Sequence, residues 1–138
     1  MILVDTSVLI HFFKGVESES SRRFKIVLQR EIPFGINSLI FQEVLQGAGS
    51  EKEYLILKKY LETQRFYHLK EPIESFAKAA KIYLDCRKRG ITIRSTIDCL
   101  IAQTALENDL LLLHEDSDFD LMAKVIPLKF FDRPVLSL

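Results

Sequence analysis

Several features that mark particular classes of protein are scarce in this sequence. Only Cys86 and Cys99 are present, thirteen positions apart and outside any Cys-x-x-Cys pair, so neither a disulfide framework nor a structural zinc site is indicated. We expect two buried free thiols. The longest apolar stretches, such as Leu110 to Leu113, are far shorter than the ~20 residues that cross a bilayer, and the N-terminus shows no targeting pattern. We therefore expect a cytoplasmic protein without a membrane partner.

An excess of charge of one sign is also missing. Nineteen basic residues balance nineteen acidic ones, so the strongly basic signature of many stand-alone nucleic-acid binders is absent. A nucleic-acid-binding function would then require the acids to gather in one site with basic residues, among them Arg94, around it. The sequence also has no phosphate-binding loop, dinucleotide-binding glycine pattern or Gly-x-Ser-x-Gly elbow, which are the sequence signatures of three large enzyme classes.

The remaining composition and the pattern of apolar residues predict an ordered α/β protein. Hydrophobic residues make up 48% and charged residues 28% of 138 residues, which fits one domain over residues 1–138. We expect strands near residues 2–4, 33–36, 66–69, 110–113 and 128–130, and helices near residues 8–13, 19–30, 38–45, 51–61, 71–89, 96–106 and 121–124. This alternation predicts a central, mainly parallel sheet flanked by helices.

The predicted helix over residues 71–89 has an apolar face that we expect to pack on the rest of the protein. Its members recur at helical spacing: Ile73, Phe76, Ala77, Ala80 and Leu84.

Acidic residues stand where the predicted fold would bring them together. Asp5 directly follows the first strand, and Asp116 and Asp118 follow the strand at residues 110–113. Sites in such folds open at the carboxyl ends of the strands, and Glu43 and Asp98 fall on helices that can lean over the same edge. Converging carboxylates repel one another by ~4 kcal/mol at ~4 Å, so they need a cation or raised pKa values. Hard oxygen ligands favour Mg²⁺ or Mn²⁺, which are suited to phosphate-ester chemistry.

Within this group we expect Asp5 and Asp98 to be the principal metal ligands. Glu43 and either Asp116 or Asp118 would bind a second ion or orient the attacking water.

Two further residues are expected to assist. Thr6 would hydrogen-bond a ligand carboxylate or a phosphate, and Arg94 would meet the scissile phosphate. The acids also fit ordinary structural roles: Asp5 as a helix cap, Asp98 as a first-turn acid favoured by the helix dipole, and Asp116 and Asp118 as loop or capping residues. Glu43 alone would be an ordinary helix charge.

Four segments resemble, in order, the motifs of the PIN domain family and especially of its VapC ribonuclease toxins. They are Ile2-Leu3-Val4-Asp5-Thr6-Ser7-Val8-Leu9-Ile10, Phe41-Gln42-Glu43-Val44, Thr96-Ile97-Asp98-Cys99-Leu100-Ile101-Ala102 and Leu113-His114-Glu115-Asp116-Ser117-Asp118-Phe119. Both Asp116 and Asp118 align with the fourth acidic position of the family, and the resemblance slightly favours Asp116. The resemblance implies a PIN-like three-layer fold and an endoribonuclease that cuts structured RNA such as transfer or ribosomal RNA. It also implies inhibition by a cognate VapB-type antitoxin and a homodimer.

Two other functions stay open at this point. A phosphatase of the haloacid dehalogenase type would also place an aspartate after the first strand, but it requires Asp-x-Asp there, and Ser7 occupies the second position. A non-catalytic RNA-binding or interaction module would keep the fold without turnover. The presence of all the acids disfavours that module.

Overall fold

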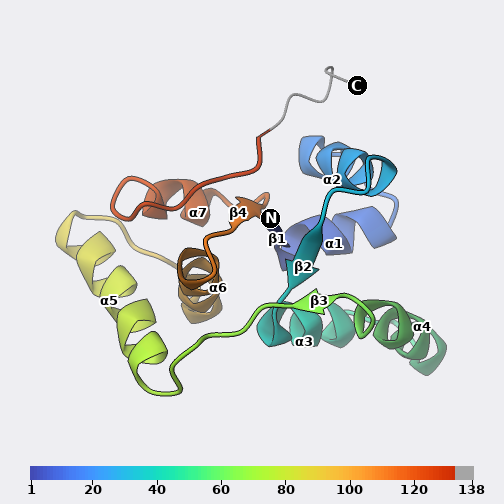
Figure 1. Cartoon of the computed structure of the whole chain (residues 1–138), viewed down its shortest axis with the longest axis horizontal. Coiled ribbons are helices and arrows are strands. Elements are labelled where there is room, and N and C mark those ends of the chain that lie inside the picture. Colours follow the sequence, from blue (N-terminus) through green and yellow to red (C-terminus); the bar gives the residue numbers. More distant parts are fainter. Residues whose placement is uncertain (133–138) are drawn as a thin grey trace.

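A four-stranded parallel sheet forms the centre of the protein (Figure 1), as described by a computed structural model over residues 1–132. The strands are β1 (Ile2–Val4), β2 (Phe34–Ile36), β3 (Arg65–Phe66) and β4 (Leu111–Leu113), and they lie in the order β3-β2-β1-β4. All neighbouring strands pair in parallel, and each crossover contains at least one helix. The predicted α/β class is confirmed.

Helices flank this sheet. They are α1 (Thr6–Phe13), α2 (Glu19–Gln29), α3 (Ser38–Gln46), α4 (Glu51–Leu61), α5 (Glu74–Lys88), α6 (Thr96–Glu107) and α7 (Ser117–Met122). Figure 1 shows α5 at the edge of the molecule, with α6 between it and the strands, while α1 and α2 lie on the other side of β1. Among the described residues, no helix has the length and apolarity needed to cross a membrane.

Strands β1 and β4 are apolar because both of their faces are covered. Leu3, Val4 and Leu112 have no exposed surface, and they pack with residues from the flanking helices, including Phe24 and Phe119. Burying a side chain of this size contributes ~1.5–3 kcal/mol relative to leaving it in water. The core therefore fixes the register of β1 against β4, in which Val4 pairs with Leu113.

This register determines where the polar edge of the sheet begins. Asp5 follows Val4 and donates its backbone N–H to the Leu113 carbonyl at 2.9 Å, so the residues after β1 and β4 start side by side. After β2, Asn37 caps α3 by accepting the Ile40 N–H at 2.9 Å, and its side chain donates to Thr104 on α6 at 3.1 Å. The start of α3 is thus tied to α6 at the same edge.

Several predicted boundaries were wrong. The third strand covers only residues 65–66, and the last predicted strand is reduced to a single bridge between Leu112 and Phe130. The last helix begins at Ser117 rather than near residue 121, because Asp116 accepts the Asp118 N–H and starts the helix early.

The predicted apolar face of α5 was also wrong. Ile73 is 82% exposed and Phe76 is 50% exposed, whereas the residues that α5 buries are Ser75, Ala79, Ile82 and Cys86. The small residues of this other face allow α5 to approach α6 closely. The two cysteines are both free and buried, as predicted.

Candidate active site

Asp5 lies at the carboxyl end of β1 and serves two structural purposes at once. It is only 4% exposed, and it caps α1 by accepting the Ser7 N–H at 3.3 Å. Burial, opposed in part by the hydrogen bonds from Ser7, raises the pKa of Asp5 to about 6, and the nearby charge of Glu43 adds to the increase. Asp5 therefore caps α1 and also lies beside another candidate site acid, Glu43.

Glu43 reaches the same region from the middle of α3. Its Oε1 accepts a 2.8 Å hydrogen bond from the Thr6 hydroxyl, which belongs to the first residue of α1. Thr6 is almost fully buried, so the length and rotamer of its side chain fix the position of the Glu43 carboxylate.

Asp98 approaches from the first turn of α6, which the Ser95 hydroxyl caps by accepting the Asp98 N–H at 3.4 Å. The Asp98 side chain shares a hydrogen bond with Asp116. Burial, this shared hydrogen bond and the charges of Asp5, Asp116 and Glu43 raise the pKa of Asp98 to about 8. In the metal-free protein the Asp98 and Asp116 pair therefore binds a proton more tightly than an isolated aspartate does.

Asp116 and Asp118 complete the group from the start of α7. Asp118 is 3% exposed, and its Oδ2 accepts the Arg94 backbone N–H at 3.0 Å and contacts the Arg94 Nε at 3.4 Å. A terminal nitrogen of the same guanidinium lies 3.5 Å from Asp116 Oδ1. Arg94 thus contacts the acids directly, and its side chain remains 71% exposed at the edge of the site.

Three of the predicted site residues can share one ion. Oxygen atoms of Asp98, Asp116 and Asp118 all lie within 4.8 Å of one another. Asp5 and Glu43 lie outside that group of three, yet both are close enough to raise the pKa of Asp98. Both alternatives for the fourth acid, Asp116 and Asp118, therefore meet Asp98. A set of carboxylate oxygens with one strongly held proton suits a hard divalent cation, which would replace that proton.

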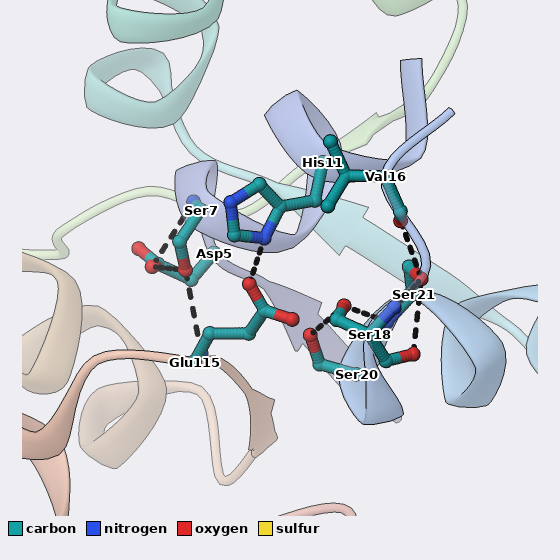
Figure 2. A network of polar contacts seen from close by, with 8 residues as sticks. All are labelled: Asp5, Ser7, His11, Val16, Ser18, Ser20, Ser21 and Glu115. Carbon is teal, nitrogen blue, oxygen red and sulfur yellow. Dashed lines mark hydrogen bonds and ion pairs between the residues drawn. The ribbon is translucent and has the colours of Figure 1, made fainter. Parts of the chain in front are cut away.

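Sequence reasoning missed the polar residues behind Asp5 (Figure 2). The Ser7 hydroxyl donates to Asp5 Oδ2 at 2.7 Å and accepts the Glu115 N–H at 3.3 Å. The Glu115 carboxylate contacts the Nδ1 atom of the His11 ring. Burial raises the pKa of Glu115, but the hydroxyls of Ser18 and Ser20 and the His11 side chain together hold it below its ordinary value. The local signal for the hydrogen bond between Ser7 and Asp5 is their spacing, because a serine two residues after a helix-capping aspartate can donate to it.

His114 contacts Asp120, which is not one of the candidate site acids, at 3.5 Å. Its ring packs against Phe119 and Phe130, with ring centroids 5.1 Å and 4.6 Å away, and burial holds its pKa below the ordinary value. This placement fits a packing role.

Comparison with known families and proteins gives one consistent match. The family model of the PIN domain matches residues 2–125. Similar curated proteins include the VapC ribonuclease Mb1587 of Mycobacterium bovis and the ribonuclease VapC11 of Mycobacterium tuberculosis. Each is 31% identical to this chain over 130 residues, which cover 94% of this chain and 96% of the relative.

Solved structures show the same fold at lower identity. VapBC-1 from nontypeable Haemophilus influenzae matches with a TM-score of 0.69 at 21% identity and covers 96% of this chain and 98% of that one. FitAcB from Neisseria gonorrhoeae matches with a TM-score of 0.68 at 19% identity over 100% of both chains. A third structure, VapBC2 from Rickettsia felis bound to a DNA fragment from their promoter, has a TM-score of 0.70 at 13% identity, covering 95% of this chain and 98% of that one.

Proposed function

This chain belongs to the PIN domain family, and we propose that it is a Mg²⁺- or Mn²⁺-dependent endoribonuclease, the toxin of a VapBC-type toxin–antitoxin pair. Its VapC relatives at 31% identity are ribonucleases by name and match nearly their whole length. Membership of this family also sets aside the phosphatase alternative, for which Ser7 already stands in the wrong place.

One observation carries the metal dependence. Oxygens of Asp98, Asp116 and Asp118 gather within 4.8 Å, and the crowding, together with burial, raises the pKa of Asp98 to about 8. A group of acids held this close by the core is destabilised when all are ionised, unless a cation is bound between them. Stability alone would not select this arrangement, whereas the binding of a divalent cation would.

Each side chain then has a task in hydrolysis. Asp98, Asp116 and Asp118 would hold the ion, and Asp5 would complete its ligands from the end of β1. Glu43, held by Thr6, would orient the attacking water or help to bind a second ion. When bound, the ion supplies neutralisation of phosphate charge and a more acidic water. Arg94, exposed beside Asp116, would contact the scissile phosphate.

The substrate and partners follow from the relatives. We propose that the substrate is a structured RNA such as transfer or ribosomal RNA, and that a cognate VapB-type antitoxin and a second copy of this chain are binding partners. Two of the structural neighbours are VapBC complexes by name, and a third is FitAcB. The balanced net charge makes recognition of RNA depend on local placement of cations such as Arg94 rather than on overall attraction.

The proposal is tested by binding of Mn²⁺ to the purified protein, followed by end mapping of cellular RNA after incubation. We expect saturable Mn²⁺ binding that Asp98→Asn weakens strongly, and discrete RNA fragments rather than general degradation. RNA that is bound but never cut, with Mn²⁺ bound normally, would favour the non-catalytic module instead.

A further inference from the structure

The Ser7 side chain joins two of the segments that carry the acids. Its hydroxyl donates to Asp5 Oδ2 at 2.7 Å and accepts the Glu115 N–H at 3.3 Å, so both its donor and an acceptor position are used (Figure 2). Asp5 ends β1, and Glu115 immediately precedes Asp116 in the segment after β4.

We propose that Ser7 is a positioning residue of the nuclease site, whose hydroxyl fixes the Asp5 carboxylate relative to the segment that carries Asp116 and Asp118. This inference rests on the proposed metal-dependent function, because it concerns the same acids. Ser7 acts through Asp5 and does not itself contact the substrate.

The contact with Asp5 is stronger than helix capping requires. The Ser7 backbone N–H already caps α1 through Asp5 Oδ2 at 3.3 Å, and the hydroxyl adds a second, shorter hydrogen bond to the same oxygen. Two donors from one residue prevent the carboxylate from rotating about its terminal bond. Hydrogen bonds to an ionised carboxylate are short and strong, and partners that orient metal ligands in this way commonly control affinity for the metal.

The other end of the link is anchored independently. The Glu115 side chain is paired with His11 of α1, and Figure 2 shows Ser18, Ser20 and Ser21 at the start of α2 beside this pair. These contacts hold the backbone of the segment after β4 against α1, which is the helix that carries Ser7. A rigid anchor is what allows one hydroxyl to set the distance between Asp5 and the acids at the start of α7.

A purely structural role for Ser7 makes a different prediction. If the hydroxyl only stabilised α1, its loss would lower thermal stability and leave the metal site unchanged. If the hydroxyl positions Asp5, its loss would weaken the binding of the metal. The fold would be kept, because the cap of α1 uses the Ser7 backbone N–H and the core does not include the hydroxyl.

The test measures Mn²⁺ binding by calorimetry and thermal unfolding in EDTA for the full chain with Ser7→Ala, and RNA cleavage across a range of Mn²⁺ concentrations. We expect Mn²⁺ affinity to fall by ~10- to 100-fold. Cleavage should fall at limiting Mn²⁺ and recover in part at saturating Mn²⁺, and the melting temperature should stay within a few degrees. Ser38→Ala is the matched control, since it removes an exposed hydroxyl from the first turn of α3.

A second pair of variants keeps the test decisive if Ser7→Ala folds poorly. Ser7→Thr and Ser7→Val have nearly the same shape and differ by a hydroxyl, so Thr should retain Mn²⁺ affinity that Val loses. Unchanged Mn²⁺ affinity in Ser7→Ala, or equal affinity in the Thr and Val variants, overturns the inference. If the wild type binds Mn²⁺ in a Ser7-dependent way but cuts no RNA, the proposed function fails while the role of Ser7 in the metal site stands.

Discussion

The Thr6 hydroxyl donates a 2.8 Å hydrogen bond to Glu43 Oε1 and so joins the first residue of α1 to the middle of α3. Ser7, the next residue, makes the corresponding bond to Asp5. Two adjacent hydroxyls at the start of one helix thus hold two of the five acids. Three consecutive residues, Asp5, Thr6 and Ser7, therefore supply one carboxylate of the site and the two hydroxyls that orient Glu43 and Asp5.

Replacing Thr6 should weaken activity without unfolding the protein. Thr6→Val keeps the buried shape and removes the donor to Glu43, so we expect cleavage to fall by ~10- to 100-fold. Thr6→Ser keeps the hydroxyl and should retain most of the activity. Initial rates of cleavage of a defined RNA compare the two variants, and equal rates would show that the contact with Glu43 has no functional role.

Asp98→Asn should stabilise the metal-free protein. The pKa of Asp98 rises from its ordinary value of 3.8 to about 8 in the folded protein. At neutral pH the folded protein must therefore either bind a proton there or keep a carboxylate that its neighbours repel, and both lower the free energy of unfolding. An uncharged amide avoids that cost, and we expect the free energy of unfolding to rise by ~1–3 kcal/mol. Urea unfolding in EDTA measures the difference. A variant less stable than wild type would contradict the proposed crowding of charge.

The gain in stability from Asp98→Asn should increase as the pH rises. Because the folded pKa of Asp98 is raised, the folded protein binds the proton more tightly than the unfolded chain, and stability falls as pH rises from about 3.8 to about 8. Asp5 acts in the same direction between 3.8 and about 6. The difference in melting temperature between variant and wild type should therefore grow from pH 5 to pH 8, while contributions from other groups cancel.

Binding of the metal should release protons. Since Asp98 must lose its proton to become a ligand, the apparent affinity for Mn²⁺ should increase by up to ~10-fold per pH unit between pH 6 and pH 8, then level off. Calorimetry in two buffers of different ionisation enthalpy counts the protons directly. An affinity that does not change with pH would mean that Asp98 is not a ligand.

Packing between β2 and β3 gives a prediction that does not involve the site. A Cβ atom added at Gly35 would lie 2.5 Å from Tyr67 Cε2 and 2.6 Å from the Arg65 carbonyl oxygen. We expect Gly35→Ala to destabilise the protein by ~1–3 kcal/mol. The control is Gly47→Ala, where the nearest atom is a carbonyl oxygen at 3.4 Å, and chemical denaturation should show a much smaller change there.

The sequence was most informative where local pattern and tertiary position coincide. The ends of β1 and β4 lie side by side, as the sequence predicted, because Asp5 and the segment that carries Asp116 each follow an apolar strand and parallel strands end at the same edge. Asp98 was assigned to a first helical turn from the Ser95 capping pattern, which the structure confirms. The candidate site residues could thus be listed from short segments of sequence, and their catalytic role stays a prediction.

Features that depend on long-range packing were not predicted. Apolar residues lie on more than one side of α5, and only contact with α6 decides that Ala79 and Ile82 are buried while Ile73 and Phe76 are exposed. The contact of Arg94 with Asp118 joins residues 24 positions apart, and no periodicity reports such a contact. The link from Glu115 to Ser7 spans 108 positions and depends on the register of β1 against β4.

The most direct measurement is cleavage of total cellular RNA by the purified protein with Mn²⁺, with Mg²⁺ and with EDTA, alongside Asp98→Asn. We expect discrete fragments that require a divalent metal and disappear in the variant, although the variant folds as well as the wild type. Cleavage that persists in EDTA or in Asp98→Asn would contradict the assignment of these carboxylates to a metal-dependent nuclease site.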